Sequence, residues 1–144
     1  MKMINTLIAA VVFCSLMILP QFATALNEKQ RNVDLNNKEG ETMSYLPAIE
    51  IVTGSDPDSA VIWLHGLGAD GNDFAPIIPE LRLPEEMGVR FIFPHAPSIP
   101  VSINGGFVMP AWYDILHMEI DRQVDEEQLV MSAKAIIRLI DREI

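Results

Sequence analysis

A glycine-rich turn after a short apolar run is the part of this sequence best suited to chemistry. Residues 60–64 are apolar, and His65-Gly66-Leu67-Gly68-Ala69-Asp70-Gly71 follows directly. Glycine permits tight or left-handed backbone, and ligands of parallel sheets bind outside the carboxyl ends of the strands. We expect the Leu67 N–H to face a developing oxyanion, where one donor lowers the barrier by roughly 3 kcal/mol. The alternative is that the glycines only make a compact turn from strand to helix.

The other residues able to do chemistry are predicted to be structural. His65 follows the apolar run 60–64, and His95 comes after the apolar run 89–93 and Pro94. Each is therefore expected to hold a turn by hydrogen bonds rather than act as a base. Asp114 follows Trp112 and Tyr113 and is expected to be a buried carboxylate that ties down a loop. No pair of histidines has metal-ligand spacing, so we expect neither a metal site nor a cofactor.

A serine nucleophile of an α/β-hydrolase lies in the pattern G-x-S-x-G, and no serine in the sequence does. Residues 66–71 match the dinucleotide-binding pattern G-x-G-x-x-G. That pattern also needs an acidic residue at the end of a second strand, and Pro94-His95 stands there instead. A dinucleotide-binding half-domain is therefore a minor alternative, which calorimetry with NAD would test; we expect no binding.

The N-terminus has the pattern of a secretory signal peptide. Lys2 precedes an apolar run over residues 7–19, and Ala23-Thr24-Ala25 supplies small residues for cleavage after Ala25. The run is shorter than the roughly 20 residues of a membrane span, although an uncleaved anchor is the alternative. We therefore predict an exported, periplasmic or secreted protein, without a stable membrane span after cleavage and with residues 26–45 as a flexible leader. The net charge of −10 argues against a nucleic-acid partner.

Apolar periodicity predicts an α/β architecture. Strands are expected at 48–52, 60–64 and 89–93, a short helix over 74–81 that Pro79 ends or kinks, and a helix over 125–143. Asp125 is expected to cap the last helix in a capping box with Gln128. Residues 94–115, rich in proline, are expected to form a long packed loop. This order predicts a mostly parallel sheet with helices on both faces.

Three blocks of sequence resemble the phospholipase/carboxylesterase family of α/β-hydrolases, which includes acyl-protein thioesterases. They are Trp63 to Gly71, Phe93-Pro94-His95-Ala96-Pro97 and Met109-Pro110-Ala111-Trp112-Tyr113-Asp114-Ile115. The resemblance covers about residues 46–144. It implies a serine hydrolase of carboxylic esters or thioesters, a small-molecule substrate, and one half of the oxyanion hole at the Leu67 N–H. It also implies that Gly66, Gly68, Trp112 and Tyr113 belong to the loops around the substrate.

The same resemblance implies a sheet interrupted before the nucleophile elbow. Family members continue after the helix that matches residues 125–144 into a strand and a G-F-S-Q-G-G elbow, with the catalytic Asp and His later. We therefore expect residues 46–144 to be the N-terminal half of the hydrolase domain, without turnover of its own. The alternative from another class is a non-catalytic half-hydrolase that acts as a binding or interaction module; a folded monomer would favour it, and aggregation would favour a fragment.

Overall fold

A four-stranded sheet forms the centre of the computed structural model, which describes residues 11–12, 44–117 and 123–144. The strands lie in the order β1-β3-β4-β2. Strands β3 and β4 are parallel, β1 pairs parallel with β3, and β2 pairs antiparallel with β4. Their bounds are Val11–Val12 for β1, Ala48–Thr53 for β2, Ser59–Leu64 for β3 and Val89–Pro94 for β4. The predicted strands at 48–52, 60–64 and 89–93 are thus confirmed to within one residue.

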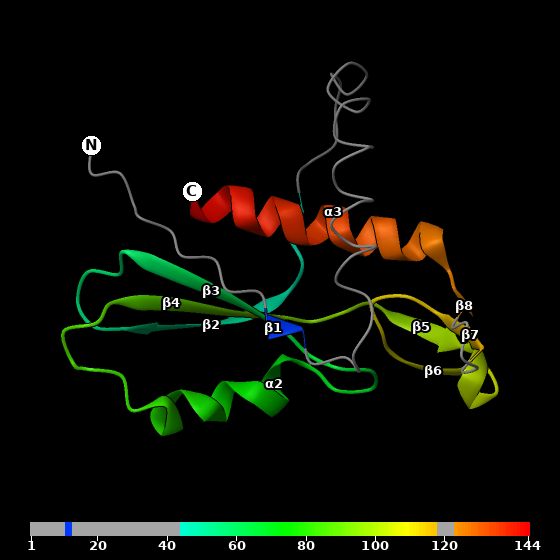
Figure 1. The fold of residues 1–144 in the computed structure, drawn as a ribbon, viewed down its shortest axis with the longest axis horizontal. Coiled ribbons are helices and arrows are strands. Elements are labelled where there is room, and N and C mark those ends of the chain that lie inside the picture. The colour runs from blue at the N-terminus through cyan, green and yellow to red at the C-terminus, as the bar shows by residue number, and fades with distance from the viewer. Residues whose placement is uncertain (1–10, 13–43, 118–122) are drawn as a thin grey trace, which may run out of the picture.

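Helices cover both faces of this sheet, as predicted (Figure 1). Alternate residues of β3 point to opposite sides because strand side chains have a period of two. Ile62 and Leu64 pack with Ile136 and Leu139 of α3, Glu126–Glu143. On the other face the core contains Val89, Phe91 and Phe93 of β4, and the helical segment after β3 packs against it.

The helical segment after β3 differs from the prediction of one helix over 74–81. The structure has a short α-helix, α2 at Gly71–Phe74, followed by a 3-10 helix, η1 at Ala75–Leu81. Pro76 and Pro79 have no N–H to donate, so a regular α-helical ladder cannot run through them. The change of helix type falls at Ala75, where the missing Pro76 N–H interrupts the α-helical ladder; Pro79 lies inside η1, and Arg82 ends η1 with a φ of +48°.

The expected long loop over residues 94–115 is wrong, because the segment forms an antiparallel hairpin. Strand β5, Ser98–Val101, pairs with β6, Phe107–Pro110, and the 3-10 turn η2, Ser102–Asn104, lies between them. Gly105 and Gly106 close the hairpin at φ values of +66° and +79°, which favour glycine. The prolines lie at strand ends and on an isolated two-stranded ribbon, where the missing N–H groups are tolerated.

A second small ribbon leads into α3. It joins β7, Ile115–His117, to β8, Gln123–Val124. Asp125 caps α3 by accepting from the Gln128 N–H at 2.9 Å. The expected capping box is wrong in its second half: the Gln128 side chain accepts from the Asp114 N–H, and the Asp125 N–H donates to the Asp114 carbonyl.

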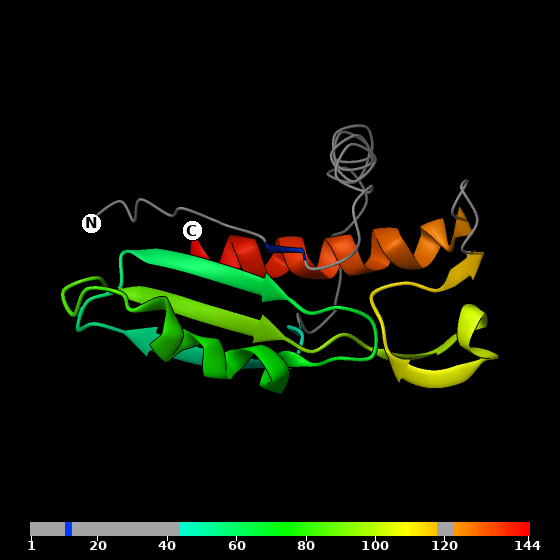
Figure 2. The same cartoon turned by 60° about the horizontal axis from the view of Figure 1, so that its bottom comes forward.

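The parallel strands β3 and β4 set the place of the candidate site, since both end at the same edge of the sheet (Figure 2). The predicted signal peptide and leader lie outside the described residues, apart from residues 11–12 and 44–45. Among the helices that the structure describes, none is long and apolar enough to span a membrane.

Candidate functional site: a strand-end turn with an outward N–H

The turn after β3 is a tight four-residue turn from Gly66 to Ala69. The Ala69 N–H donates to the Gly66 carbonyl at 3.2 Å. Gly68 occupies the third position with a φ of +76°, which is the position that a type II turn reserves for glycine. Leu67 occupies the second position and is 37% exposed.

His65 is buried under this turn, with 2% of its surface exposed. Its Nε2 accepts from the Ala96 N–H at 3.0 Å, and its Nδ1 lies 2.8 Å from the Gly66 carbonyl oxygen. Because Nε2 is the acceptor, these partners assign the proton to Nδ1, which then donates to Gly66. The ring thus joins the turn after β3 to the segment after β4.

The direction of the Leu67 N–H follows from these bonds. The Gly66 carbonyl accepts from both the His65 ring and the Ala69 N–H. The C=O and the N–H of a planar trans peptide point in opposite directions, so the Leu67 N–H points away from the buried ring. Within residues 44–117 and 123–144 it donates to no acceptor. This N–H is therefore an aimed, unused donor beside a strand end.

His95 holds the other side of the same edge. The His95 Nδ1 accepts from the Gly71 N–H at 3.3 Å, and the main-chain N–H of His95 donates to the Pro47 carbonyl at 2.8 Å. A Cβ on Gly71 would lie 2.5 Å from the Phe93 carbonyl oxygen, so the backbones touch here. The His65 ring thus reaches from the turn after β3 to the segment after β4, and the His95 ring reaches back from that segment to the start of α2.

Asp70 begins α2 as its N-cap. Its carboxylate accepts from the Asn72 N–H at 2.6 Å, and the Asp73 carboxylate accepts from the Asp70 N–H at 2.7 Å. The hydrogen bonds from Asn72 lower the pKa of Asp70. An ionised cap fixes where the turn stops and the helix starts.

Trp112 lies against the turn from the segment that follows the hairpin. Its indole Nε1–H donates to the His65 carbonyl at 2.9 Å, and the two rings are 5.1 Å apart between centroids. Two residues earlier, the Pro110 carbonyl accepts from the Gly68 N–H at 2.9 Å. The structure thus brings Trp112, His65, Gly66 and Gly68 together. Tyr113 follows in the chain and is partly buried.

Asp114 has the contacts of a carboxylate that ties down a loop. Its Oδ1 accepts from the Ser102 N–H at 2.7 Å and its Oδ2 from the Ser102 hydroxyl at 2.5 Å. Its main chain contacts Gln128 and Asp125 at the start of α3. Asp114 is 9% exposed, and the bond from the Ser102 hydroxyl is the main reason that its pKa is lowered. These contacts join the hairpin to α3.

The lowered pKa of Asp114 predicts how stability depends on pH. The protein to be measured is the polypeptide that the source gene encodes and that contains these 144 residues, called the gene product below. The native state favours ionised Asp114, so its contribution is complete above the unfolded pKa of about 3.9 and is lost as the pH falls through the lower native pKa. D114N should cost about 1–3 kcal/mol at pH 7 and flatten the loss of stability below pH 4. Urea unfolding at pH 7, 5, 4 and 3 gives the free energy of unfolding of the wild type and of D114N. The same dependence of this free energy on pH in both proteins would contradict the prediction.

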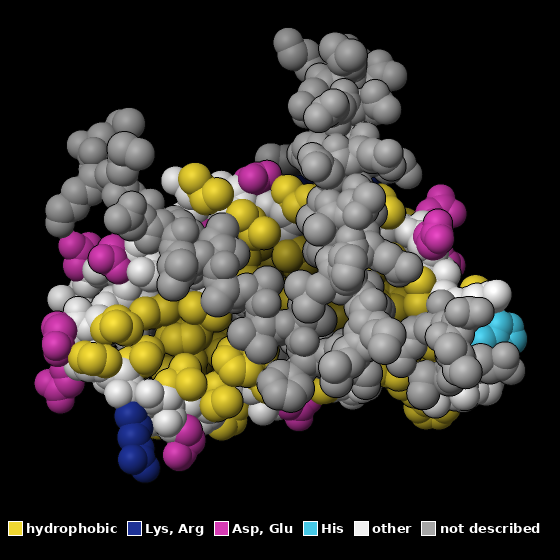
Figure 3. Space-filling model, in the orientation of Figure 1, with side chains coloured by type: hydrophobic (Ala, Val, Ile, Leu, Met, Phe, Trp, Pro, Cys, Tyr) yellow, Lys and Arg dark blue, Asp and Glu magenta, His cyan; other side chains and the backbone are white. Residues whose placement is uncertain are grey.

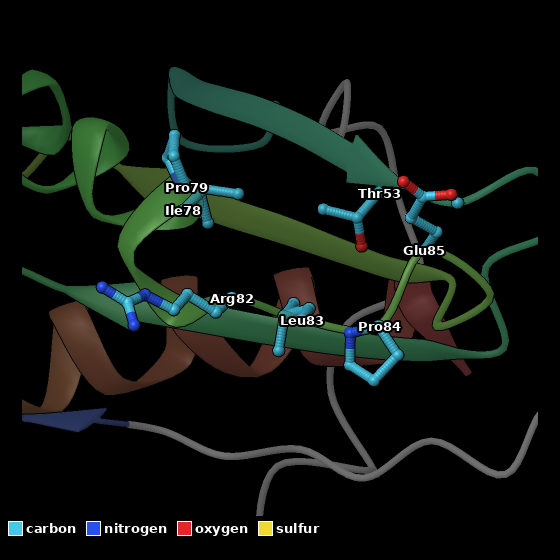
Figure 4. Close-up of a pocket in the computed structure, with 8 residues that line it drawn as sticks. Thr53, Ile78, Pro79, Arg82, Leu83, Pro84 and Glu85 are labelled. Carbon is cyan, nitrogen blue, oxygen red and sulfur yellow. The ribbon is translucent and has the colours of Figure 1, made fainter.

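A surface hollow of about 240 Å³ lies at the opposite end of the sheet (Figure 4). It lies beside Thr53 at the end of β2, which pairs with the first residue of β4, and it is lined in part by η1. It therefore contains none of the predicted site residues. Within the described residues, His, Cys, Asp and Glu form no group of three that could hold a metal.

Sequence reasoning missed the partners of the predicted residues. Pro110, Ala96 and Ser102 hold the turn, the His65 ring and Asp114, respectively. Two of these contacts use main-chain atoms, which carry no residue-type signal. The third joins Ser102, in the turn of the hairpin, to Asp114, which follows the hairpin, and the sequence did not predict the hairpin.

Comparisons with known proteins show the family of this chain. A family model described as Phospholipase/Carboxylesterase matches residues 46–144. The chain is similar to acyl-protein thioesterase 1 of Cryptococcus neoformans var. neoformans serotype D (39% identity, 60% of this chain, 37% of the relative). It is also similar to acyl-protein thioesterase 1 of Gibberella zeae (40% identity, 62% of this chain, 41% of the relative).

A solved structure with the same fold is Zea mays acyl-protein thioesterase 2. It matches with a TM-score of 0.59 and 32% identity, over 67% of this chain and 41% of that chain. Arabidopsis thaliana SOBER1 matches with a TM-score of 0.54 and 32% identity, over 58% of this chain and 41% of that chain. The chain thus spans about two fifths of the length of the relatives it matches. By the family model and the fold together, this chain belongs to the phospholipase/carboxylesterase family of α/β-hydrolases.

Proposed function

We propose that this chain supplies the oxyanion-binding half of an exported serine hydrolase that cleaves carboxylic esters or thioesters. In this proposal the Leu67 N–H donates to the oxyanion that forms when a serine attacks the substrate carbonyl. The attacking serine, and the acid and base that activate it, come from polypeptide outside residues 1–144. Family membership supports the hydrolase class, and the names of the relatives support an ester or thioester substrate.

The observation that carries the proposal is the direction of the Leu67 N–H. The Gly66 carbonyl is bound on the inner side by the His65 ring at 2.8 Å, so the next N–H faces outward. An oxyanion donor acts because it is already aimed before charge develops and needs no reorganisation. The Ala69 bond is the ordinary bond of the turn, and the His65 ring adds a second donor that fixes the same peptide.

The edge of β3 supports a nucleophile contributed by further polypeptide. Strand β4 pairs with one side of β3, and on the other side the described residues of β1 pair with it only at Trp63 and Leu64. On the face that shows this edge, hydrophobic side chains gather between the levels of α3 and η1 (Figure 3). A further strand placed along this edge would end beside the Leu67 turn, because parallel strands end at one edge of a sheet.

Ester hydrolysis tests the proposed activity. We expect the gene product to hydrolyse p-nitrophenyl esters or thioester analogues, and we expect a serine-directed organophosphate to abolish the activity. A heat-treated sample is the control for spontaneous hydrolysis. A folded gene product without turnover on esters or thioesters would contradict the proposal and would favour the non-catalytic binding module instead.

We also propose that residues 1–25 direct export and are removed. The support is the order of Lys2, the apolar run 7–19 and the small residues before Leu26. Protein isolated from the source should therefore begin at Leu26, as measured by N-terminal sequencing. A mature protein that retains Met1 or Lys2 would overturn cleavage at this position.

A further inference from the structure

The segment from Pro110 to Trp112 holds the turn after β3 on both sides of Leu67. The Pro110 carbonyl accepts from the Gly68 N–H, on the carboxyl side of Leu67, at 2.9 Å. The Trp112 indole N–H donates to the His65 carbonyl, on the amino side, at 2.9 Å. Of these two contacts, only the second uses a side chain, so it is the one that a substitution can remove.

The Trp112 bond acts on the peptide next to the donor. The His65 carbonyl and the Gly66 N–H share one peptide plane, and the Gly66 carbonyl and the Leu67 N–H share the next. Rotation of the first plane at Gly66 re-aims the second, because glycine has few steric limits on its φ and ψ. The indole N–H thus restricts rotation of the His65–Gly66 peptide.

Trp112 is itself held from the helical layer. The Ser132 hydroxyl on α3 donates to the Trp112 carbonyl, and the Ala111 N–H donates to the Pro97 carbonyl at 3.0 Å. The Trp112 ring also packs against the core cluster that β3 and α3 share. A side chain fixed by a helix, a core and a hairpin is a rigid support for a strand-end turn.

We propose that Trp112 is a positioning residue for the oxyanion donor, and that its indole N–H keeps the Leu67 N–H aimed through the His65–Gly66 peptide. The proposal rests on the proposed hydrolase function. Trp112 itself touches neither the substrate nor the reacting atoms in this account. Its loss should therefore weaken binding of the transition state while substrate binding is nearly unchanged.

The test is W112F in the gene product, because phenylalanine keeps an aromatic ring and removes the N–H. The chain offers a matched control in Trp63. Its Nε1 is buried without a hydrogen-bond partner among the described residues, and its ring packs with Phe74 and Phe93 on the other face of the sheet. W63F also removes one indole N–H, but this N–H holds nothing in the turn.

We expect W112F to lower kcat about 10- to 100-fold, the range for a misplaced catalytic group, with KM changed less than 3-fold. The inhibition constant of a trifluoromethyl ketone, which forms an oxyanion on the attacking serine, should rise by the same factor as kcat falls. W63F should leave kcat and this inhibition constant near those of the wild type. Equal kcat values for folded W112F and W63F would overturn the proposal.

A second variant covers the case in which W112F does not fold. S132A removes the hydroxyl that holds the Trp112 carbonyl and should lower kcat less than W112F, again without a rise in KM. An unchanged kcat in S132A, together with an unfolded W112F, would assign Trp112 to stability and overturn the proposal. An inactive wild-type gene product would instead contradict the proposed function, so the two failures are distinguishable.

Discussion

L67P should abolish most of the activity of the gene product while leaving its fold intact. Leu67 occupies the second position of a turn whose third residue, Gly68, has a φ of +76°. Proline favours this second position of a type II turn. The Leu67 N–H has no acceptor among the described residues, so its removal breaks no native hydrogen bond there. The substitution therefore removes one oxyanion donor and little else.

Loss of one oxyanion donor lowers kcat about 10²- to 10³-fold, and this is the effect we expect for L67P. L67A is the matched control, because it shortens the same side chain and keeps the N–H. We expect L67A to retain kcat within about 3-fold of the wild type, since it leaves the donor in place. Circular dichroism and the urea midpoint check the fold. An L67P enzyme as active as L67A would show that this N–H does not bind the oxyanion.

G71A should cause the largest loss of stability among the changes considered. A Cβ at this position would lie 2.5 Å from the Phe93 carbonyl oxygen and 3.1 Å from the Phe93 Cβ. Both contacts involve the central strand β4, which cannot move without disturbing its neighbours on each side. Overpacking of this kind costs typically 1–3 kcal/mol, and rigid backbone places G71A near the upper end, at about 3 kcal/mol.

The measurement is the free energy of unfolding of the gene product in urea. N72A is the control, because Asn72 is adjacent and exposed, and its side-chain amide donates to the Asp70 carboxylate at 3.0 Å. We expect N72A to cost less than about 1 kcal/mol, as is usual for an exposed helix-cap contact. Equal stabilities of G71A and N72A would mean that the strand-to-helix packing at His95 and Phe93 is looser than described.

The strands and the long helix could be predicted because their signals are local. Residues 60–64 are a continuous apolar run, which is typical of a strand covered on both faces, and α3 carries a helical apolar stripe that begins after a capping aspartate, Asp125. The sequence also placed His65, Gly66, Leu67 and Gly68 at a strand end, where the structure has them. Their chemical roles remain predictions.

The hairpin over residues 98–110 was missed because its strands lack an alternating pattern and contain proline. Its pairing and its contact with the turn after β3 are long-range, and single-sequence periodicity does not report such contacts. The same reason explains Gln128, whose side chain serves Asp114 rather than the N-terminus of its own helix. Local capping rules describe which groups need partners, and tertiary packing decided which partner was used.

Serine labelling tests the central claim most directly. The gene product is reacted with a fluorophosphonate probe, digested, and the labelled peptide is identified by mass spectrometry. The account predicts one labelled serine in a G-x-S-x-G sequence outside residues 1–144, with labelling lost after heat treatment. A probe-labelled serine within residues 44–144, or no labelled serine in a folded gene product that hydrolyses esters, would contradict the assignment of this chain to the oxyanion-binding half of a serine hydrolase.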